Sequence, residues 1–256
     1  LSAFWRFLLG GLALAVWAAV MRIDLRPKRE DWPGLLVLSL LFTVQIGLMN
    51  IGISLTTAAM ATVLISTNPF FANLFSHFFV PGDRMKARRL VGLTVAFAGV
   101  AVIVLPTGDG AAMTGASLLG NLTVLSSAAL LGGRQVAISL MVRRMGTAQV
   151  IFWQGLISLP LFLAAGLWVE DVNWSMLNWV PLTALAYQGL AVAGFAFMAA
   201  AWLLRRHNPS VVSGFNFISP VVGVFLSTIV FEEPVGWNLW VGLVAVGLGL
   251  VLVTRR

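Results

Sequence analysis

The sequence predicts an all-α polytopic membrane protein. Of its 256 residues, 59% are hydrophobic and only 10% are charged, and the mean hydropathy is +0.96. Soluble domains carry about 25% charged residues, so this composition indicates a chain that lies in a lipid bilayer. A spanning helix requires about 20 mostly apolar residues, and nine such stretches recur at 1–21, 33–54, 57–80, 87–105, 115–141, 148–169, 179–204, 208–231 and 236–253.

The basic residues follow alternate connections between these stretches. All Lys and Arg residues except Arg6 and Arg134 fall in the segments 22–32, 81–89, 142–147, 205–207 and 255–256, and the intervening connections contain none. The positive-inside rule assigns such segments to the cytoplasm, so we expect a multi-pass protein with a cytoplasmic C-terminus. Membrane topology therefore explains the net charge of +7, and no nucleic-acid partner is expected.

The chain contains an internal repeat with an offset of about 150 residues. The matched residues occur in the same order in both halves, which predicts two structural repeats, at 1–105 and 115–253. The pairs are Phe4-Trp5 with Phe152-Trp153, Trp32 with Trp179, Gly47 with Gly194, Pro69 with Pro220, Asp83 with Glu233, Gly92 with Gly242 and Gly99 with Gly249.

The stretch at 115–141 has no counterpart in the first half of the chain. We therefore expect one further helix before Leu1, which gives a plan of ten helices, five in each repeat. An odd number of helices per repeat makes the second repeat enter the membrane from the opposite side. The charges agree with inversion, because the connection before Trp32 is basic whereas the one before Trp179 contains Glu170 and Asp171.

These features resemble the drug/metabolite transporter superfamily, in particular its EamA-type members with two five-helix repeats. The resemblance covers essentially the whole chain. It rests on the Arg-Phe-Leu-Leu sequence at 6–9, the Asn68-Pro69 and Ser219-Pro220 breaks, and an acidic residue before the Gly-x6-Gly sequence of each final repeat helix. Asp83 departs from the Glu that the family usually has. The resemblance implies a bacterial inner-membrane location and export of small metabolites such as amino acids.

The paired prolines predict polar helix breaks near the middle of the membrane. Pro69 leaves the carbonyl of Ile65 without its usual helical donor, and Pro220 does the same to Asn216. Freed carbonyls at this depth must be satisfied by neighbours, water or ligand. A simple packing kink is the alternative for each proline. Together with neighbouring polar residues, the breaks predict a substrate cavity lined by Asn68, Asn216 and Ser219.

Three further polar residues within the apolar stretches are candidates for the same cavity. Arg134 is costly in a membrane, and small residues beside it suggest a helix that faces protein, so we expect a substrate-facing cation. Arg6 either extends to the far interface or contributes to the cavity. Its repeat-related residue is Gln154, which favours the cavity. The aromatic residues Trp153 and Tyr187 are candidates for apolar cavity walls, with interfacial anchoring as the alternative.

The sequence argues against enzymatic chemistry. It contains no Cys, no His-Glu-x-x-His and no Gly-x-Ser-x-Gly, so no catalytic residue, cofactor or metal site is predicted. All nine acidic residues fall in connections or at helix ends, so no intramembrane carboxylate supports coupling to protons or sodium. His77 is expected to lie at the interface.

We therefore expect a transporter of small metabolites, in the direction of export, that works by alternating access of two inverted five-helix bundles. Its predicted partners are a small-molecule substrate and the lipid bilayer. A channel-like facilitator and a non-transporting membrane scaffold stay open as alternatives, and a homodimer is compatible with the prediction. The substrate, the driving ion and the oligomeric state do not follow from the sequence.

Overall fold

A computed structural model describes residues 1–104, 118–169, 179–222 and 237–254, and all regular structure in these ranges is helical. Each of the predicted apolar stretches contains helix. Helices long and apolar enough to cross a membrane cover Ser2–Val20, Arg29–Ser54, Leu118–Arg144, Thr147–Trp168 and Leu182–Arg206, with shorter apolar helices at Pro209–Val222 and Trp240–Thr254. The prediction of an all-α polytopic membrane protein is confirmed.

The chain forms two compact units. The first consists of Leu1–Thr43 and Ala137–Arg206, and the second of Val44–Val136 and His207–Arg256. Each unit therefore combines segments from both predicted repeats.

The first unit packs around aromatic side chains. It contains α1, the first part of α2, the end of α6, and then α7, α8, η3 and α9, whose bounds are Ser2–Val20, Trp32–Ser54, Leu118–Arg144, Thr147–Val169, Trp179–Tyr187, Gln188–Ala196 and Phe197–Arg206. The ring of Phe7 on α1 stacks on Phe162 with centroids 5.2 Å apart and meets Phe42 edge to face at 4.7 Å. These rings join α1, α2 and α7 in one buried cluster.

The helix predicted at 179–204 is interrupted by a π-helical segment, η3. Here α1 and η3 approach closely, because a Cβ on Gly10 would lie 2.8 Å from the Cβ of Ala193, and one on Gly189 would lie 2.7 Å from the Cβ of Leu9. Only glycine permits such contact between helix backbones. The wider π turn is thus located where two helices touch.

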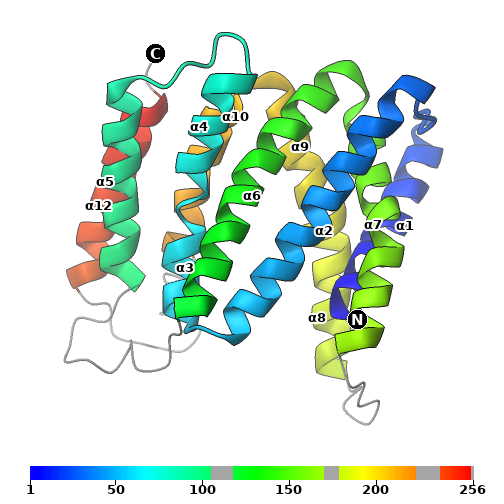
Figure 1. Ribbon diagram of the computed structural model, residues 1–256, viewed down its shortest axis with the longest axis horizontal. Coiled ribbons are helices and arrows are strands. Elements are labelled where there is room, and N and C mark those ends of the chain that lie inside the picture. Colours follow the sequence, from blue (N-terminus) through cyan, green and yellow to red (C-terminus); the bar gives the residue numbers. More distant parts are fainter. Residues whose placement is uncertain (105–117, 170–178, 223–236, 255–256) are drawn as a thin grey trace. The chain divides into compact units, whose positions relative to one another are not determined.

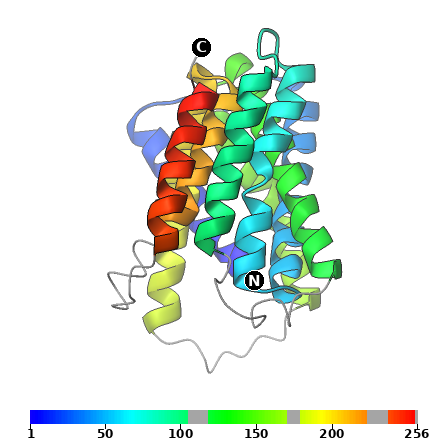
Figure 2. The ribbon, with the colours of Figure 1, turned by 90° about the vertical axis from the view of Figure 1, so that its left-hand side faces the viewer.

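The second unit contains the discontinuous helices. Besides the rest of α2 and α6, it has α3, α4, α5, α10, η4 and α12, whose bounds are Ala58–Ile65, Asn68–Phe79, Ala87–Val104, Pro209–Gly214, Phe215–Phe217 and Trp237–Thr254. Helix α5 lies along α12, and α4 lies beside α10 (Figure 1). The view in Figure 2 shows α5 and α12 side by side along most of their length.

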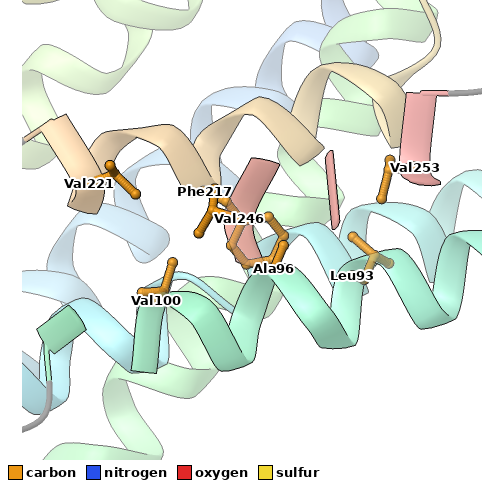
Figure 3. Close-up of a cluster of buried hydrophobic side chains, with 7 residues drawn as sticks. All are labelled: Leu93, Ala96, Val100, Phe217, Val221, Val246 and Val253. Atoms are coloured by element: carbon orange, nitrogen blue, oxygen red, sulfur yellow. The ribbon is translucent and has the colours of Figure 1, made fainter. Parts of the chain in front are cut away.

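The α5 and α12 helices meet through glycines and small apolar side chains. A Cβ on Gly92 would lie 2.7 Å from the carbonyl oxygen of Gly249, and one on Gly99 would lie 2.8 Å from that of Gly242. The Gly-x6-Gly sequences thus permit close packing. Figure 3 shows the buried cluster beside this contact, formed by Leu93, Ala96, Val100, Phe217, Val221, Val246 and Val253.

Several helix ends differ from the predicted ones. Helix α6 continues to Arg144 and α9 to Arg206, while Arg88 and Arg89 lie in the first turn of α5, so these basic residues are not in connections as predicted. An arginine near a helix C-terminus interacts favourably with the helix dipole, and its long side chain can reach the membrane interface. A helix can therefore continue beyond the end of its apolar stretch. The predicted roles of Glu170, Asp171, Glu233 and the C-terminal arginines concern residues outside the described ranges.

Candidate functional site

The first helix break lies between α3 and α4, at the Asn68-Pro69 pair. Helix α3 ends at Ile65 and α4 begins at Asn68, with Pro69 in its first turn, where the missing N–H costs least. Two hydroxyl side chains add hydrogen bonds to carbonyls in the last turn of α3. Ser66 Oγ donates to Thr62 O at 2.7 Å, and Thr67 Oγ1 donates to Leu64 O at 2.6 Å. These hydroxyls reinforce the end of α3, since the same two carbonyls also accept hydrogen bonds from the backbone N–H groups of Ser66 and Thr67.

Asn68 supplies the donor that Pro69 removes. Its Nδ2 donates to the carbonyl oxygen of Ile65 at 3.0 Å, the carbonyl that the sequence predicted to be freed. The Asn68 side chain is nearly fully buried, with 3% of its surface exposed. The break is thus a stable, internally bonded feature rather than a simple kink in a continuous helix.

The second break replaces an α-helical turn with a tighter one. Helix α10 ends at Gly214, η4 follows as a 3₁₀ turn over Phe215–Phe217, and helical residues resume at 218–222 around Pro220. Asn216 lies in this 3₁₀ turn and is partly exposed. Irregular backbone therefore lies shortly before each proline, at 66–67 and at 215–217.

A hydrogen bond joins the two breaks. Asn216 Nδ2 donates to Asn68 Oδ1 at 3.0 Å, so the bonds run from Asn216 to Asn68 and on to the Ile65 carbonyl. In the predicted repeat, Asn216 occupies the position of Ile65, four residues before the proline. The structure thus brings together Asn68 and Asn216, two of the predicted cavity residues, within one unit.

A second amide strengthens the contact between α4 and α10. Asn73 Nδ2 donates to the carbonyl oxygens of Pro69 at 2.8 Å and of Ser210 at 3.3 Å. Its Oδ1 is buried and receives no hydrogen bond from the described residues. One amide therefore bonds to the first turn of α4 and to the beginning of α10 at once.

The same interface ends at a buried carboxylate, Asp83, in the turn between α4 and α5. Its side chain is fully buried. It accepts hydrogen bonds from Ser76 Oγ on α4, from Ser210 Oγ on α10, both at 2.6 Å, and from Arg89 on α5, with which it forms an ion pair. Arg89 also donates to Ser210 Oγ at 2.9 Å. One carboxylate thus joins three helices.

The surroundings of Asp83 favour its ionised form. Burial alone would raise the pKa of this carboxyl, but hydrogen bonds from Ser210, Ser76 and Arg89, with the positive charge of Arg89, outweigh burial and lower the pKa below its ordinary value. An ionised carboxylate accepts hydrogen bonds only, which suits this ring of donors.

Arg134 lies on another side of α6 from these residues. Gly132 faces α4, because a Cβ there would lie 2.6 Å from the backbone nitrogen of Ala72. Arg134 comes two residues after Gly132, which corresponds to a rotation of about 200° around the helix axis. Arg134 is therefore on the same side of α6 as Ser127. That side faces α2, because Ser127 Oγ donates to the carbonyl oxygen of Gln45 at 2.9 Å. Arg134 is buried, but it does not face the two asparagines.

Four predicted residues, Arg6, Trp153, Gln154 and Tyr187, lie in the first unit. Arg6 donates to Gln188 Oε1 at 3.4 Å, near the close contact of α1 and η3. Gln154 is buried on α7, and its Oε1 accepts no hydrogen bond from the described residues. Tyr187, at the end of α8, is 67% exposed. Their predicted contribution to substrate binding stays a prediction.

The remaining two predicted residues have different surroundings. Trp153 Nε1 donates to the carbonyl oxygen of Leu25 at 2.6 Å, and its ring packs edge to face on Trp32. These contacts hold the connection before α2 and leave substrate binding by Trp153 untested. Ser219 is exposed in the helical segment 218–222, next to Pro220.

Sequence reasoning missed the burial of Asp83 and the role of its partners. An acidic residue in a polar connection normally faces water, so its position gave no sign of burial. The available signals were a hydroxyl seven residues before it and an arginine six residues after it, in a turn too short to separate them. Among the described residues, no group of three His, Cys, Asp or Glu side chains could hold a metal ion.

The fold and the paired polar breaks are typical of multi-spanning α-helical transporters with discontinuous helices. The EamA-like transporter family model matches residues 1–105 and 118–255, and the chain belongs to this family.

Its relatives are themselves named only as transporters. The uncharacterized transporter YvbV of Bacillus subtilis is 28% identical over 98% of this chain and 81% of its own length. An uncharacterized transporter of Archaeoglobus fulgidus is 26% identical over 99% of this chain and 87% of its own length. The uncharacterized inner membrane transporter YedA of Escherichia coli K12 is 25% identical over 97% of this chain and 79% of its own.

A solved crystal structure has the same fold. It superposes with a TM-score of 0.85 at 19% sequence identity, over 99% of this chain and 86% of that one. The likeness to this structure shows the fold, and membership of the EamA-like transporter family makes the protein a membrane transporter of a small molecule.

Proposed function

We propose that the protein exports small metabolites, such as amino acids or related compounds, across the bacterial inner membrane by alternating access. The observation that carries the proposal is the hydrogen bond between Asn216 and Asn68, which joins two helix breaks from opposite halves of the chain at 3.0 Å. Repeat transporters place their binding sites at such discontinuous helices.

The chemistry of this site favours a polar substrate. Both breaks present amides whose donors and acceptors can be exchanged for those of a ligand. In the first break the backbone carbonyls are already bonded by Ser66, Thr67 and Asn68, so a ligand that replaces Asn216 as donor to Asn68 Oδ1 leaves that turn intact. A substrate with an amino group supplies such a donor, which supports amino acids and their relatives.

The remaining predicted residues enter the proposal with less support from geometry. Arg134, Arg6 and Gln154 would contribute if the substrate site extends beyond the two asparagines. A carboxylated zwitterion would then find a cation as well as amides. The two repeats of the five-helix plan, at 1–105 and 115–253, are the bundles that we propose to rock against each other.

The test of export is an untargeted comparison of metabolites in the medium. Cells expressing the protein are compared with cells expressing an Asn68→Leu/Asn216→Leu double variant at equal membrane level. We expect a small set of compounds to accumulate outside only with the wild type. If the two media contained the same metabolites at the same concentrations, with both proteins folded and inserted, export through this site would be contradicted. If compounds do accumulate, dependence of the flux on membrane potential alone would favour a channel-like facilitator over alternating access.

The orientation has its own test. Lys and Arg concentrate in the connections that we assign to the cytoplasm. A reporter fused after Arg256 should therefore be active only as a cytoplasmic reporter, and periplasmic activity would overturn the proposed orientation.

A further inference from the structure

We propose that Asp83 is a positioning residue for the binding site, because its ionised carboxylate fixes α10 against α4 and thereby sets the contact between Asn68 and Asn216. This inference rests on the proposed function for the role of the two asparagines. The contact geometry itself does not depend on that function.

The first step is the connection of α10 to Asp83. Ser210 Oγ lies 2.6 Å from both carboxylate oxygens of Asp83, and the Ser210 backbone N–H points to Oδ2 at 3.4 Å. Ser210 is fully buried. Since α10 starts at Pro209, Asp83 holds the beginning of this helix directly.

The second step is the connection of Asp83 to α4 and α5. Ser76 Oγ, in the last turn of α4, donates to the same Oδ2 at 2.6 Å, and Ser76 is fully buried. Arg89 bonds both to Asp83 and to Ser210 Oγ. All these partners donate to Asp83, and the carboxylate accepts throughout. An amide in its place would direct N–H groups at one or more of them.

The third step transmits the position of α10 to the site. Asn73 Nδ2 bonds at once to the carbonyl oxygens of Ser210 and Pro69. Asn68, which accepts from Asn216, directly precedes Pro69. From Asp83 to Asn216, buried polar contacts therefore run along one side of α4, and a shift of α10 at Ser210 moves Asn216 relative to Asn68.

The geometric test uses spin labels, which the absence of native cysteine makes simple. Labels on Leu74→Cys and Phe215→Cys, both at exposed positions, report on the site. Labels on Phe78→Cys and His207→Cys report on the end near Asp83. We expect Asp83→Asn to broaden both distance distributions in membranes and Asp83→Glu to restore them. An unchanged Leu74–Phe215 distribution, with or without a change at the other pair, would overturn the inference.

The matched control is Asp31→Asn. Asp31 is also a buried aspartate, but its carboxylate accepts from the backbone N–H of Lys28 at 3.1 Å, three residues away, in the first unit. The same chemical change there should leave both label distances as in the wild type. If Asp31→Asn broadened them equally, the effect would be general destabilisation, and the inference would fail.

The functional test measures transport of the compounds that the wild type accumulates in the medium. At equal membrane level, we expect Asp83→Asn to raise the substrate concentration for half-maximal transport about fivefold, which corresponds to about 1 kcal/mol of binding, with the maximal rate unchanged and Asp83→Glu restoring the wild-type value. A fall in maximal rate alone would contradict positioning of the binding site. If no compound is exported, the proposed function fails, whereas the label distances still decide the role of Asp83.

Discussion

The second unit joins the two halves of the chain through two interfaces of opposite chemistry. Between α5 and α12, glycines allow the backbones to touch, and the side chains beside them are apolar, as Leu93, Ala96 and Val246 illustrate. Between α4 and α10, the buried groups are a carboxylate, hydroxyls and amides, held by hydrogen bonds.

The difference shows what each interface can do. Lipid tails are as apolar as valine, so the α5–α12 contact is stabilised by close packing and offers a solute nothing that the lipid does not. Buried polar groups are costly in a membrane unless bonded, and a chain retains them mainly where function needs them. We therefore propose that the α5–α12 contact serves packing and that the α4–α10 interface binds the substrate.

The largest expected effect is the loss of folded protein when a substitution disrupts the apolar α5–α12 interface. In Gly249→Leu the added Cβ would lie 2.5 Å from the carbonyl oxygen of Gly92 and 2.6 Å from the backbone nitrogen of Ala96, so the two helices must separate. We expect little folded protein by size-exclusion chromatography in detergent. Gly247→Leu on the same helix, where a Cβ meets nothing within 4 Å, should fold normally. Equal behaviour of the two variants would refute close packing as the basis of this interface.

Next in size is the pH dependence of the polar interface. Because the pKa of Asp83 is lowered in the folded protein, its contribution to stability is present above the ordinary aspartate pKa of about 3.9 and is lost as the pH falls through the folded value. Thermal unfolding, followed by tryptophan fluorescence, should show Asp83→Asn less stable than the wild type at pH 7, by about 2–4 kcal/mol. The difference should shrink towards pH 3, and a constant difference would contradict an ionised Asp83.

A smaller effect on stability is expected from a substitution in the apolar cluster, and it should leave transport unchanged. Val100 is fully buried in the α5–α12 cluster, and Val100→Ala leaves a small cavity there. We expect a loss of about 1–2 kcal/mol in stability with transport per folded molecule unchanged. Transport that falls as far as it does in the asparagine variants would remove the distinction between the two interfaces.

The last prediction concerns the difference in stability between variants of the two asparagines. Asn68→Leu removes the donor to the Ile65 carbonyl as well as the acceptor for Asn216, whereas Asn216→Leu leaves the Ile65 bond in place. An unsatisfied buried carbonyl costs about 1–3 kcal/mol, so Asn68→Leu should unfold at a lower temperature than Asn216→Leu. Asn50→Leu, at an exposed amide on α2, serves as the control. The reverse order of stability would argue against the bond to Ile65.

The sequence predicted the features that depend on length, periodicity and proline chemistry. Apolar stretches gave the helices, and the prolines gave both breaks and the freed Ile65 carbonyl. It did not predict which side chain would bond that carbonyl, because the partner depends on a rotamer of Asn68. Nor did it predict the bond from Asn216, since that bond depends on how α10 packs against α4.

The buried groups were harder to predict than the breaks. Asp83 was expected at a polar helix connection, but short hydrogen bonds from two helices enclose it. Arg134 was expected to face the substrate. The position of Gly132 against α4 places Arg134 on another side of α6 from Asn68, and its contribution to substrate binding stays a prediction. The burial of a side chain and the neighbour that it faces depend on how the helices pack, which a single sequence specifies only indirectly.

The account is tested most directly by measuring metabolite export for three proteins at equal membrane level, the wild type, Asn216→Leu and Val100→Ala. We predict that the same compounds accumulate in the medium with the wild type and with Val100→Ala, and that Asn216→Leu abolishes their accumulation. Export by Asn216→Leu at the wild-type rate would contradict the assignment of substrate binding to the α4–α10 interface.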